Sequence, residues 1–276
     1  MRHIILHHHI FKNAGSTLDS ALERFFGLGF ATLHDNGDDG RVDATMLFDF
    51  IGRRPDARAI SSHHFHAQDY DAAIGLRRLC FFHFAMIRRP LARFLSIYKF
   101  YRRSNLDHPI AQAARTLLPS QFVRLLIERH PHMIDNPQVN VFANHGTYRR
   151  PVSDADFATA CARVQQYSLC APVERYDEAM VTVEYFVSPA YGLDGLDLSY
   201  VRQNTSEFLQ GEEMIAELIG RANFDWLACM NERDERLWNE ANADLERRMR
   251  LVPDFERRLA HFRGRCAARS HQLRSA

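Results

Sequence analysis

The sequence predicts an α/β protein with a parallel sheet flanked by helices, in a three-layer arrangement. Short apolar segments of strand length alternate with longer segments of helical periodicity, as in chains that form parallel sheets. The segment Leu79–Ile87 is an almost continuous apolar run, which is typical of a strand covered on both faces. With 276 residues, 46% of them hydrophobic and 25% charged, the chain can form a sizeable core. We therefore expect a single domain over residues 1–276, ending in a helical, basic segment from about residue 231.

Periodicity and the positions of proline place each element along the chain. Strands are predicted at His3–Phe11, Ala57–Phe65, Leu79–Ile87 and Tyr167–Pro172. Helices are predicted at Leu18–Phe26 and Ala44–Gly52, from Pro90 to about Arg103, and at 110–129, 153–166, 175–187, 211–220, 231–249 and 254–268. The clearest loops are Lys12–Thr17 and Gly192–Asp197. This alternation of strands and helices favours a parallel sheet wrapped by helices.

Charge, cysteine content and hydropathy argue against several classes of protein. A net charge of +1 argues against a nucleic-acid partner held by the overall field of the protein. The five cysteines are odd in number and form no C-x-x-C pair, so neither a disulfide framework nor a zinc module is indicated. Histidines interrupt the first apolar residues, which argues against a signal peptide. No run approaches the roughly 20 apolar residues of a membrane span, and we expect a cytoplasmic protein without one.

Arginine supplies nearly all the basic charge, since the chain has only two lysines, Lys12 and Lys99. The last segment is locally basic through Arg257, Arg258, Arg263, Arg265, Arg269 and Arg274. This run indicates a solvated terminal helix, which we favour, or a contact surface for an anionic partner.

The loop Lys12–Thr17 joins the first strand to the first helix and has the composition of an anion site. A small-residue loop before a helix directs unpaired backbone N–H groups and the positive end of the helix dipole at one point. Alternatively, Ser16 or Thr17 only caps the helix. A nucleotide-triphosphatase loop is a poor match, because a hydroxyl residue must follow its lysine and here Asn13 follows Lys12. The candidate ligands are Lys12, Asn13, Ala14, Gly15, Ser16 and Thr17.

The segment Ile87–Tyr98 is the second candidate anion site. Arg88 ends a buried strand, Pro90 opens a helix, and Ser96 lies about two turns into that helix. A guanidinium fork and a hydroxyl can therefore converge on one phosphate group. An amphipathic helix alone would account for the apolar side chains of this segment, but not for the spacing of its arginine, proline and serine.

Both segments resemble elements of sulfotransferases that use 3′-phosphoadenosine-5′-phosphosulfate (PAPS). Lys12–Leu18 is similar to the family's 5′-phosphosulfate loop, P-K-x-[GA]-[ST]-[ST]-x-L, once an offset of one residue around Ala14 and Gly15 is allowed, and Phe11 replaces the proline. Arg88–Tyr98 is similar to the family's 3′-phosphate element, R-[DN]-P-x-x-R-x-x-S-x-Y, although Arg89 replaces the Asp or Asn. The resemblance implies a P-loop type of sulfotransferase fold and transfer of a sulfuryl group from PAPS to an acceptor hydroxyl. It also implies 3′-phosphoadenosine-5′-phosphate (PAP) as the product, and no metal ion.

A histidine-rich segment, Ser61–His66, lies between the two anion elements in the sequence. In the branch of the family that includes heparan-sulfate-2-O-sulfotransferase-like proteins, a strand ends here in a [GS]-H-[FV] element whose histidine deprotonates the acceptor. His64 is the best match to that histidine, and His66 is the alternative. The resemblance thus implies that His64 is the general base and that Lys12 stabilises the leaving oxygen. It also implies a carbohydrate hydroxyl as the acceptor.

Four further segments resemble family elements in their order along the chain. The third of them implies that Arg202 reaches the 3′-phosphate side of the cofactor. Each segment is a weak signal by itself, and their order is what supports the resemblance over most of the chain. The segments are Asp135–Gln138, Val173–Asp177, Arg202–Thr205 and Asp234–Asn239.

Other functions remain open at the level of the sequence. Histidine runs can indicate a metal site, but consecutive strand residues point to opposite faces, so neither His7–His9 nor His63–His66 offers three ligands to one ion. A P-loop kinase-like phosphotransferase would depend on Mg²⁺. A non-catalytic binder of nucleotides or sulfated glycans would keep the Arg88 element but would not need His64.

Overall fold

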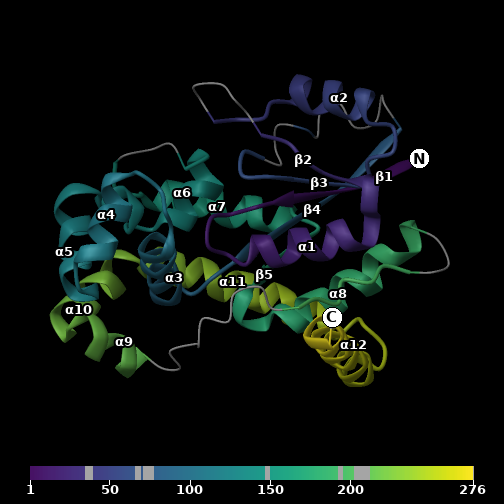
Figure 1. Cartoon of the computed structure of the whole chain (residues 1–276). Helices are drawn as coiled ribbons and strands as arrows, with labels where there is room; N and C mark the ends of the chain where they lie inside the picture. The colour runs from purple at the N-terminus through teal and green to yellow at the C-terminus, as the bar shows by residue number, and fades with distance from the viewer. Residues whose placement is uncertain are drawn as a thin grey trace. The chain divides into compact units, whose positions relative to one another are not determined.

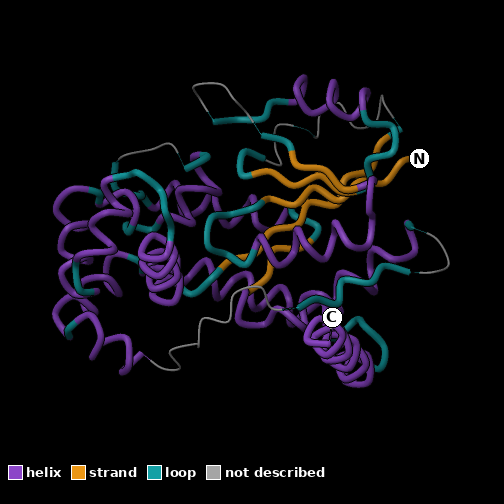
Figure 2. The backbone as a smooth tube through the Cα atoms, viewed as in Figure 1, coloured by secondary structure: helices purple, strands orange, loops and turns teal. Residues whose placement is uncertain are grey.

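The computed structural model describes residues 1–34, 40–65, 70, 78–146, 150–191, 195–201 and 212–275. The chain divides into two compact units. Unit 1 comprises Met1–Ile87, Ala162–Gln203 and Glu240–Ala276, and unit 2 comprises Arg88–Cys161 and Asn204–Asn239. Unit 1 carries the sheet, whereas the described part of unit 2 is built from helices (Figure 1, Figure 2).

Over the described residues, the sheet of unit 1 has five parallel strands in the order β2-β3-β1-β4-β5. The strands are β1 (Arg2–His8), β2 (Phe30–Thr32), β3 (Ala59–Ser62), β4 (Leu79–Ile87) and β5 (Leu169–Pro172). The predicted α/β class with a parallel sheet is therefore confirmed. In the centre, His8 of β1 pairs with Ser62 of β3 and with Ala85 of β4. The segments that follow these three strands thus leave the sheet at the same edge.

Helices cover both faces of this sheet. On one face lies α2 (Ala44–Arg53), and on the other lie α1 (Gly15–Phe26), α8 (Tyr176–Val187) and α12 (Phe255–Ser275) (Figure 1). Alternate residues of β1 supply the two cores, because successive strand side chains point to opposite faces. Ile4 and Leu6 pack in the core beneath α2, and Ile5 packs in the core beneath α1.

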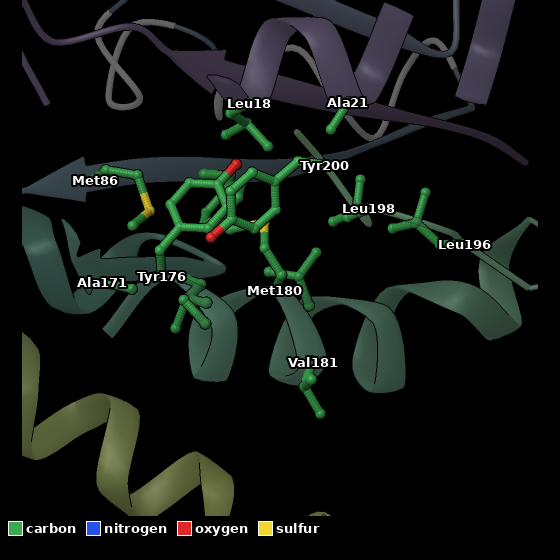
Figure 3. Close-up of a cluster of buried hydrophobic side chains, with 14 of the residues drawn as sticks. Leu18, Ala21, Met86, Ala171, Tyr176, Met180, Val181, Leu196, Leu198 and Tyr200 are labelled. Carbon is green, nitrogen blue, oxygen red and sulfur yellow. The ribbon is translucent and has the colours of Figure 1, made fainter. Parts of the chain in front are cut away.

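The larger core lies between the sheet and α8. Figure 3 shows Tyr176 and Met180 of α8 directed toward Leu18 of α1 and Met86 of β4. The rings of Tyr176 and Tyr200 meet edge to face with centroids 4.6 Å apart. Burying a leucine such as Leu18, which is fully inaccessible to solvent, stabilises the fold by about 1.5–3 kcal/mol. This core holds α1, and therefore the loop before it, against the sheet.

The side chains of Arg263, Arg265 and Arg269 in α12 pair with other parts of unit 1, whereas the sequence favoured a solvated helix. Arg265 and Arg269 both pair with Asp197, and Arg265 also pairs with Glu184 of α8 at 2.6 Å. Arg24 of α1 pairs with the same Asp197 carboxylate at 3.4 Å. Although partial burial opposes ionisation, hydrogen bonds from Ser199 and the charges of the arginines lower the pKa of Asp197 to about 2. Acidic residues of unit 1 thus offset much of the basic charge that the sequence shows.

Asp197→Asn is expected to lower the melting temperature by roughly 2–4 °C at pH 7 and to have little effect near pH 2. A carboxyl whose pKa is lowered by folding stabilises the fold above its unfolded pKa of about 3.9, and this stabilisation is lost as the pH falls toward 2. Thermal melts of the wild type and Asp197→Asn from about pH 7 to pH 2 measure the difference between their melting temperatures. The control is Asp225→Asn, in the exposed pair Arg221–Asp225, which should change little. If the difference between the two melting temperatures stays constant down to pH 2, the charge of Asp197 does not contribute to stability.

Unit 2 packs short helices around an aromatic and aliphatic core. Its helices are α3 (Pro90–Arg103), α4 (Pro109–Thr116), α5 (Pro119–Arg129), α6 (Pro137–Asn144), α9 (Glu212–Ile219) and α10 (Arg221–Met230). The core includes Phe94 and Tyr98 of α3, Phe122 of α5 and Phe224 of α10. Two helices, α7 (Asp154–Gln166) and α11 (Glu232–Met249), begin in unit 2 and end in unit 1.

Some predicted boundaries are wrong. The helix predicted at 110–129 is two helices, because Pro119 opens α5 and the preceding Leu118 is extended, as residues before proline prefer to be. The first strand ends at His8 and not at Phe11, since the Ile10 amide turns back to donate to the His8 carbonyl. The short strand β2 and the helix α10 were not predicted. Over the described residues, every helix is too short or too polar to cross a lipid bilayer.

Candidate functional site

The loop after β1 has an unusual backbone. Lys12 and Ala14 both adopt the left-handed conformation, with φ of 66° and 61°, which non-glycine residues rarely do. The buried side chain of Asn13, between them, donates from Nδ2 to the Met86 carbonyl of β4 at 2.9 Å. This hydrogen bond ties the loop to the neighbouring strand. A left-handed residue costs free energy, so the loop is held in this shape by its surroundings.

The first turn of α1 leaves amide groups available. Ala14 is the N-cap residue and no side chain caps the helix, so the alternative in which Ser16 or Thr17 serves as the cap is wrong. The amides of Thr17 and Leu18 donate to the Ala14 carbonyl. Within the part of the chain that the structure describes, the amides of Gly15 and Ser16 donate to no acceptor. These two N–H groups and the helix dipole form a positive end that can bind an anion.

A carboxylate beneath the loop binds two histidines. His7 lies in β1 and His9 directly follows that strand, and their Nδ1 atoms are 2.7 and 2.8 Å from Oδ1 and Oδ2 of Asp19 in α1. Although burial opposes ionisation of Asp19, these hydrogen bonds hold the pKa of its carboxyl well below the usual range. Burial lowers the pKa of His7, and its contact with Asp19 opposes that shift. The cluster joins β1 to α1 around the loop.

These three side chains could also hold a metal ion, since their ligand atoms lie within 4.8 Å of one another. In the structure both imidazoles hydrogen-bond directly to the carboxylate, and Nδ1 of His7 also lies 3.0 Å from Oγ of Ser61. His8 points to the opposite face of the sheet, as strand geometry predicts. There its Nε2 is 2.9 Å from Nδ1 of His83, and its Nδ1 is 3.0 Å from the hydroxyl of Tyr167. Burial lowers the pKa of His83 to about 4.

Gly15 is required by the position of His9. A Cβ atom built on Gly15 would lie 2.0 Å from Cδ2 of the His9 ring, far inside van der Waals contact. The φ angle of Gly15 is not in the left-handed region, so backbone freedom is not the reason for glycine here. The sequence placed Gly15 among the candidate ligands of an anion. The group that approaches it in the structure is an imidazole.

Gly15→Ala is expected to destabilise the protein by about 1–3 kcal/mol, because the added methyl overlaps a packed ring. In the His9→Ala background the same substitution should cost less than about 1 kcal/mol, and chemical denaturation of the four proteins of this cycle measures the difference. Gly52→Ala in α2 is the control, because a Cβ there meets nothing within 4 Å. It should be neutral or stabilising by up to about 1 kcal/mol. Equal costs in both backgrounds would contradict the overlap with His9.

Two histidines directly follow β3: His63 packs on the cluster of His7, His9 and Asp19, and the backbone of His64 is hydrogen-bonded. The ring of His63 packs on His9 with centroids 4.0 Å apart. Partial desolvation and the charge of His9 lower the pKa of His63 to about 4. The amide of His64 donates to Oγ of Ser62 at 3.0 Å, and its carbonyl accepts from the Val42 amide. His66, the alternative base, lies outside the described residues.

In unit 2, Arg88 is held through its backbone by a buried side chain. Oε1 of Gln138 accepts from the Arg88 amide at 2.9 Å, and Nε2 of Gln138 donates to the Arg88 carbonyl at 2.7 Å. Gln138 in turn contacts Asp234, which is fully buried. Ser96 is half-buried in α3. Arg202 lies outside the described residues.

The unusual Arg89 of this element has its own partner. Its guanidinium lies over the ring of Trp238, 4.5 Å from the centroid. Arg89 is the N-cap residue of α3, and its side chain makes no capping hydrogen bond. Arg93 is buried, and burial lowers its pKa to about 10, an effect that Asp234 opposes. The turn before α3 is thus stabilised by stacking where the family pattern has a short polar residue.

Sequence reasoning missed several of these residues. Asp19 gave no signal, because only the packing of α1 on β1 brings it to His7 and His9. Gln138 and Asp234 belong to segments that were noted only as weak resemblances in a fixed order along the chain. In the structure Gln138 hydrogen-bonds the Arg88 backbone, and Asp234 hydrogen-bonds Gln138.

The comparisons with known proteins give little guidance on activity. No family model matches the chain. The chain is 27% identical over 251 residues to a protein of Archaeoglobus fulgidus, described only as an uncharacterized protein. The alignment covers 87% of this chain and 96% of that protein. The likeness therefore extends over most of both chains and leaves the activity to be argued from the residues.

Proposed function

We propose that this chain is a sulfotransferase of the P-loop type, which transfers a sulfuryl group from PAPS to an acceptor hydroxyl. The observation that supports the proposal most is the pairing of β1 with β4 in the centre of the sheet. The Lys12 loop follows the first of these strands, and Arg88 follows Ile87, the last residue of the second. Two segments with anion-binding chemistry therefore start from neighbouring strand ends, as a cofactor with phosphates at both ends would require.

The loop would bind the 5′-phosphosulfate. The free amides of Gly15 and Ser16 are suited to its oxygens, and Lys12 would stabilise the charge that develops on the leaving oxygen. In an in-line displacement, charge spreads over the non-bridging oxygens, so positioning and fixed positive charge contribute most of the catalysis. Backbone strain at Lys12 and Ala14 also supports a functional role, because such strain concentrates at binding sites. The proposed 5′ ligands are Lys12, Asn13, Ala14, Gly15, Ser16 and Thr17.

The remaining roles follow the family pattern. Arg88, Ser96 and Arg202 would bind the 3′-phosphate, which distinguishes PAPS from ATP. His64 would accept the proton of the acceptor hydroxyl, and we propose a carbohydrate as the acceptor. No step of this scheme uses a metal ion.

A kinase-like phosphotransfer has less support. A Mg²⁺-binding loop needs a hydroxyl residue next to its lysine, and Asn13 occupies that place. The Asn13 carboxamide donates to the Met86 carbonyl, so it serves to anchor the loop. A non-catalytic binder of nucleotides or sulfated glycans would bind PAP without turnover on any acceptor.

PAP is expected to raise the melting temperature well above the effect of AMP or of ATP with Mg²⁺. At a concentration of 100 Kd, a ligand of the native state stabilises it by about 2.7 kcal/mol. Thermal shift assays with the three nucleotides measure this preference. Arg88→Ala should abolish the preference, whereas Arg103→Ala, at an exposed position at the end of α3, should retain it. Equal shifts with PAP and AMP in the wild type would overturn the proposed function.

A further inference from the structure

The backbone of Arg88 is paired as if β4 continued past its last residue. Arg88 directly follows β4, whose final residue, Ile87, pairs with Pro172 of β5. The side-chain carboxamide of Gln138 hydrogen-bonds both backbone groups of Arg88. It accepts from the Arg88 N–H at 2.9 Å and donates to the Arg88 carbonyl at 2.7 Å. Asparagine and glutamine are the side chains whose carboxamide offers a neutral acceptor and N–H donors side by side. One side chain therefore replaces a neighbouring strand for this single residue.

Gln138 is itself fixed by Asp234. Oδ2 of Asp234 accepts from the amide of Gln138 at 3.0 Å and from its Nε2 at 3.2 Å, and Oδ1 accepts from the Val139 amide at 2.7 Å. The amide of Asp234 donates to Oδ1 of Asn136 at 2.9 Å. Gln138 and Asp234 are both completely buried. A carboxylate at the first turn of α6 also meets the positive end of the helix dipole.

Helix capping alone does not account for this arrangement. The bonds from Asp234 to the amides of Gln138 and Val139 cap α6, and a glutamine side chain is not needed for them. The buried carboxamide that reaches Arg88 serves a separate purpose. Because a buried side chain with both hydrogen bonds made has little freedom, it fixes the Arg88 backbone and therefore the starting direction of its guanidinium group.

We propose that Gln138, held by Asp234, is a positioning residue that sets the preference of the chain for a 3′-phosphorylated nucleotide. It does so by fixing the backbone of Arg88, and with it the point and the direction from which the side chain reaches the 3′-phosphate. This inference rests on the proposed function. Small displacements of a binding group are costly, since a shift of about 1 Å can change rates by about 10²-fold.

Gln138→Met tests the proposal, because it keeps a similar volume and removes both hydrogen bonds to Arg88. The variant is expected to lower the ratio of PAP affinity to AMP affinity at least tenfold, as measured by titration calorimetry with each nucleotide. The matched control is Asn223→Leu, which removes a buried amide bound to the Ser120 and Ile219 carbonyls in the same unit. This control should lower the stability of unit 2 and keep the affinity ratio of the wild type.

Hydrogen exchange separates the positioning role from the proposed function. In the wild type, the Arg88 amide should be protected from exchange although it lies outside every described strand and helix, and Gln138→Met should speed its exchange at least tenfold. This readout needs no nucleotide, and the wild-type protection is measurable even if the variant folds poorly. An unprotected Arg88 amide, or an unchanged affinity ratio in Gln138→Met, overturns the positioning role. A protected amide in a wild type with no preference for PAP overturns the proposed function instead.

Discussion

Replacing His64 by alanine is expected to lower sulfuryl transfer by about 10²–10⁴-fold while leaving PAP binding unchanged. A hydroxyl is a poor nucleophile until its proton is removed, and the proposed function assigns that step to His64. His63 and His64 directly follow β3. The ring of His63 packs on that of His9, which belongs to the cluster with His7 and Asp19. PAP release in the presence of a mixed panel of polysaccharides measures turnover, and thermal shift with PAP measures binding.

His63→Ala and His66→Ala are the controls for this prediction, and both should retain most of the activity. The pH dependence gives an independent test, because the pKa of His63 is lowered to about 4. A base at His63 would stay unprotonated, and active, as the pH falls toward 4. Loss of transfer well above pH 4 therefore argues against His63 as the base. If His64→Ala keeps most of its activity, the base is another residue, and the control with the larger loss identifies it.

Asp234→Ala is expected to destabilise unit 2 by about 3–5 kcal/mol. The substitution leaves two buried amides, those of Gln138 and Val139, without their acceptor, and it removes the charge that faces the buried Arg93. Both tryptophans of the chain, Trp226 and Trp238, lie in unit 2, so their fluorescence during urea unfolding reports on this unit.

Asp234→Asn should lose less stability than Asp234→Ala. The asparagine keeps one acceptor oxygen, and burial raises the pKa of Asp234, so its charge is costly to hold in the folded state. Asp225→Asn, on an exposed position of α10 in the same unit, should change the unfolding curve by less than about 0.5 kcal/mol. A loss below about 1 kcal/mol in Asp234→Ala would mean that water or other donors replace the carboxylate, and that the cluster does not hold the unit together.

The sequence by itself was sufficient for those parts of the fold that depend on local patterns. Leu79–Ile87 and Pro90–Arg103 were predicted with the bounds that β4 and α3 have, because a continuous apolar run and a proline at a helix start are local signals. The separation of His8 from His7 and His9 also followed from the period of a strand. The same local reasoning overlooked Pro119, which divides the helix predicted at 110–129.

The tertiary structure decided which side chains meet. Asp19 reaches His7 and His9 only because the core beneath α1 holds that helix on β1. Gln138 is 50 positions from Arg88 and 96 from Asp234, distances at which neither periodicity nor turn chemistry carries information. The contacts of the α12 arginines could not be predicted from the sequence either. Their charge was evident in the sequence, but their partners on α8 and near residue 197 are set by how apolar faces pack, and a linear pattern of charges does not encode that.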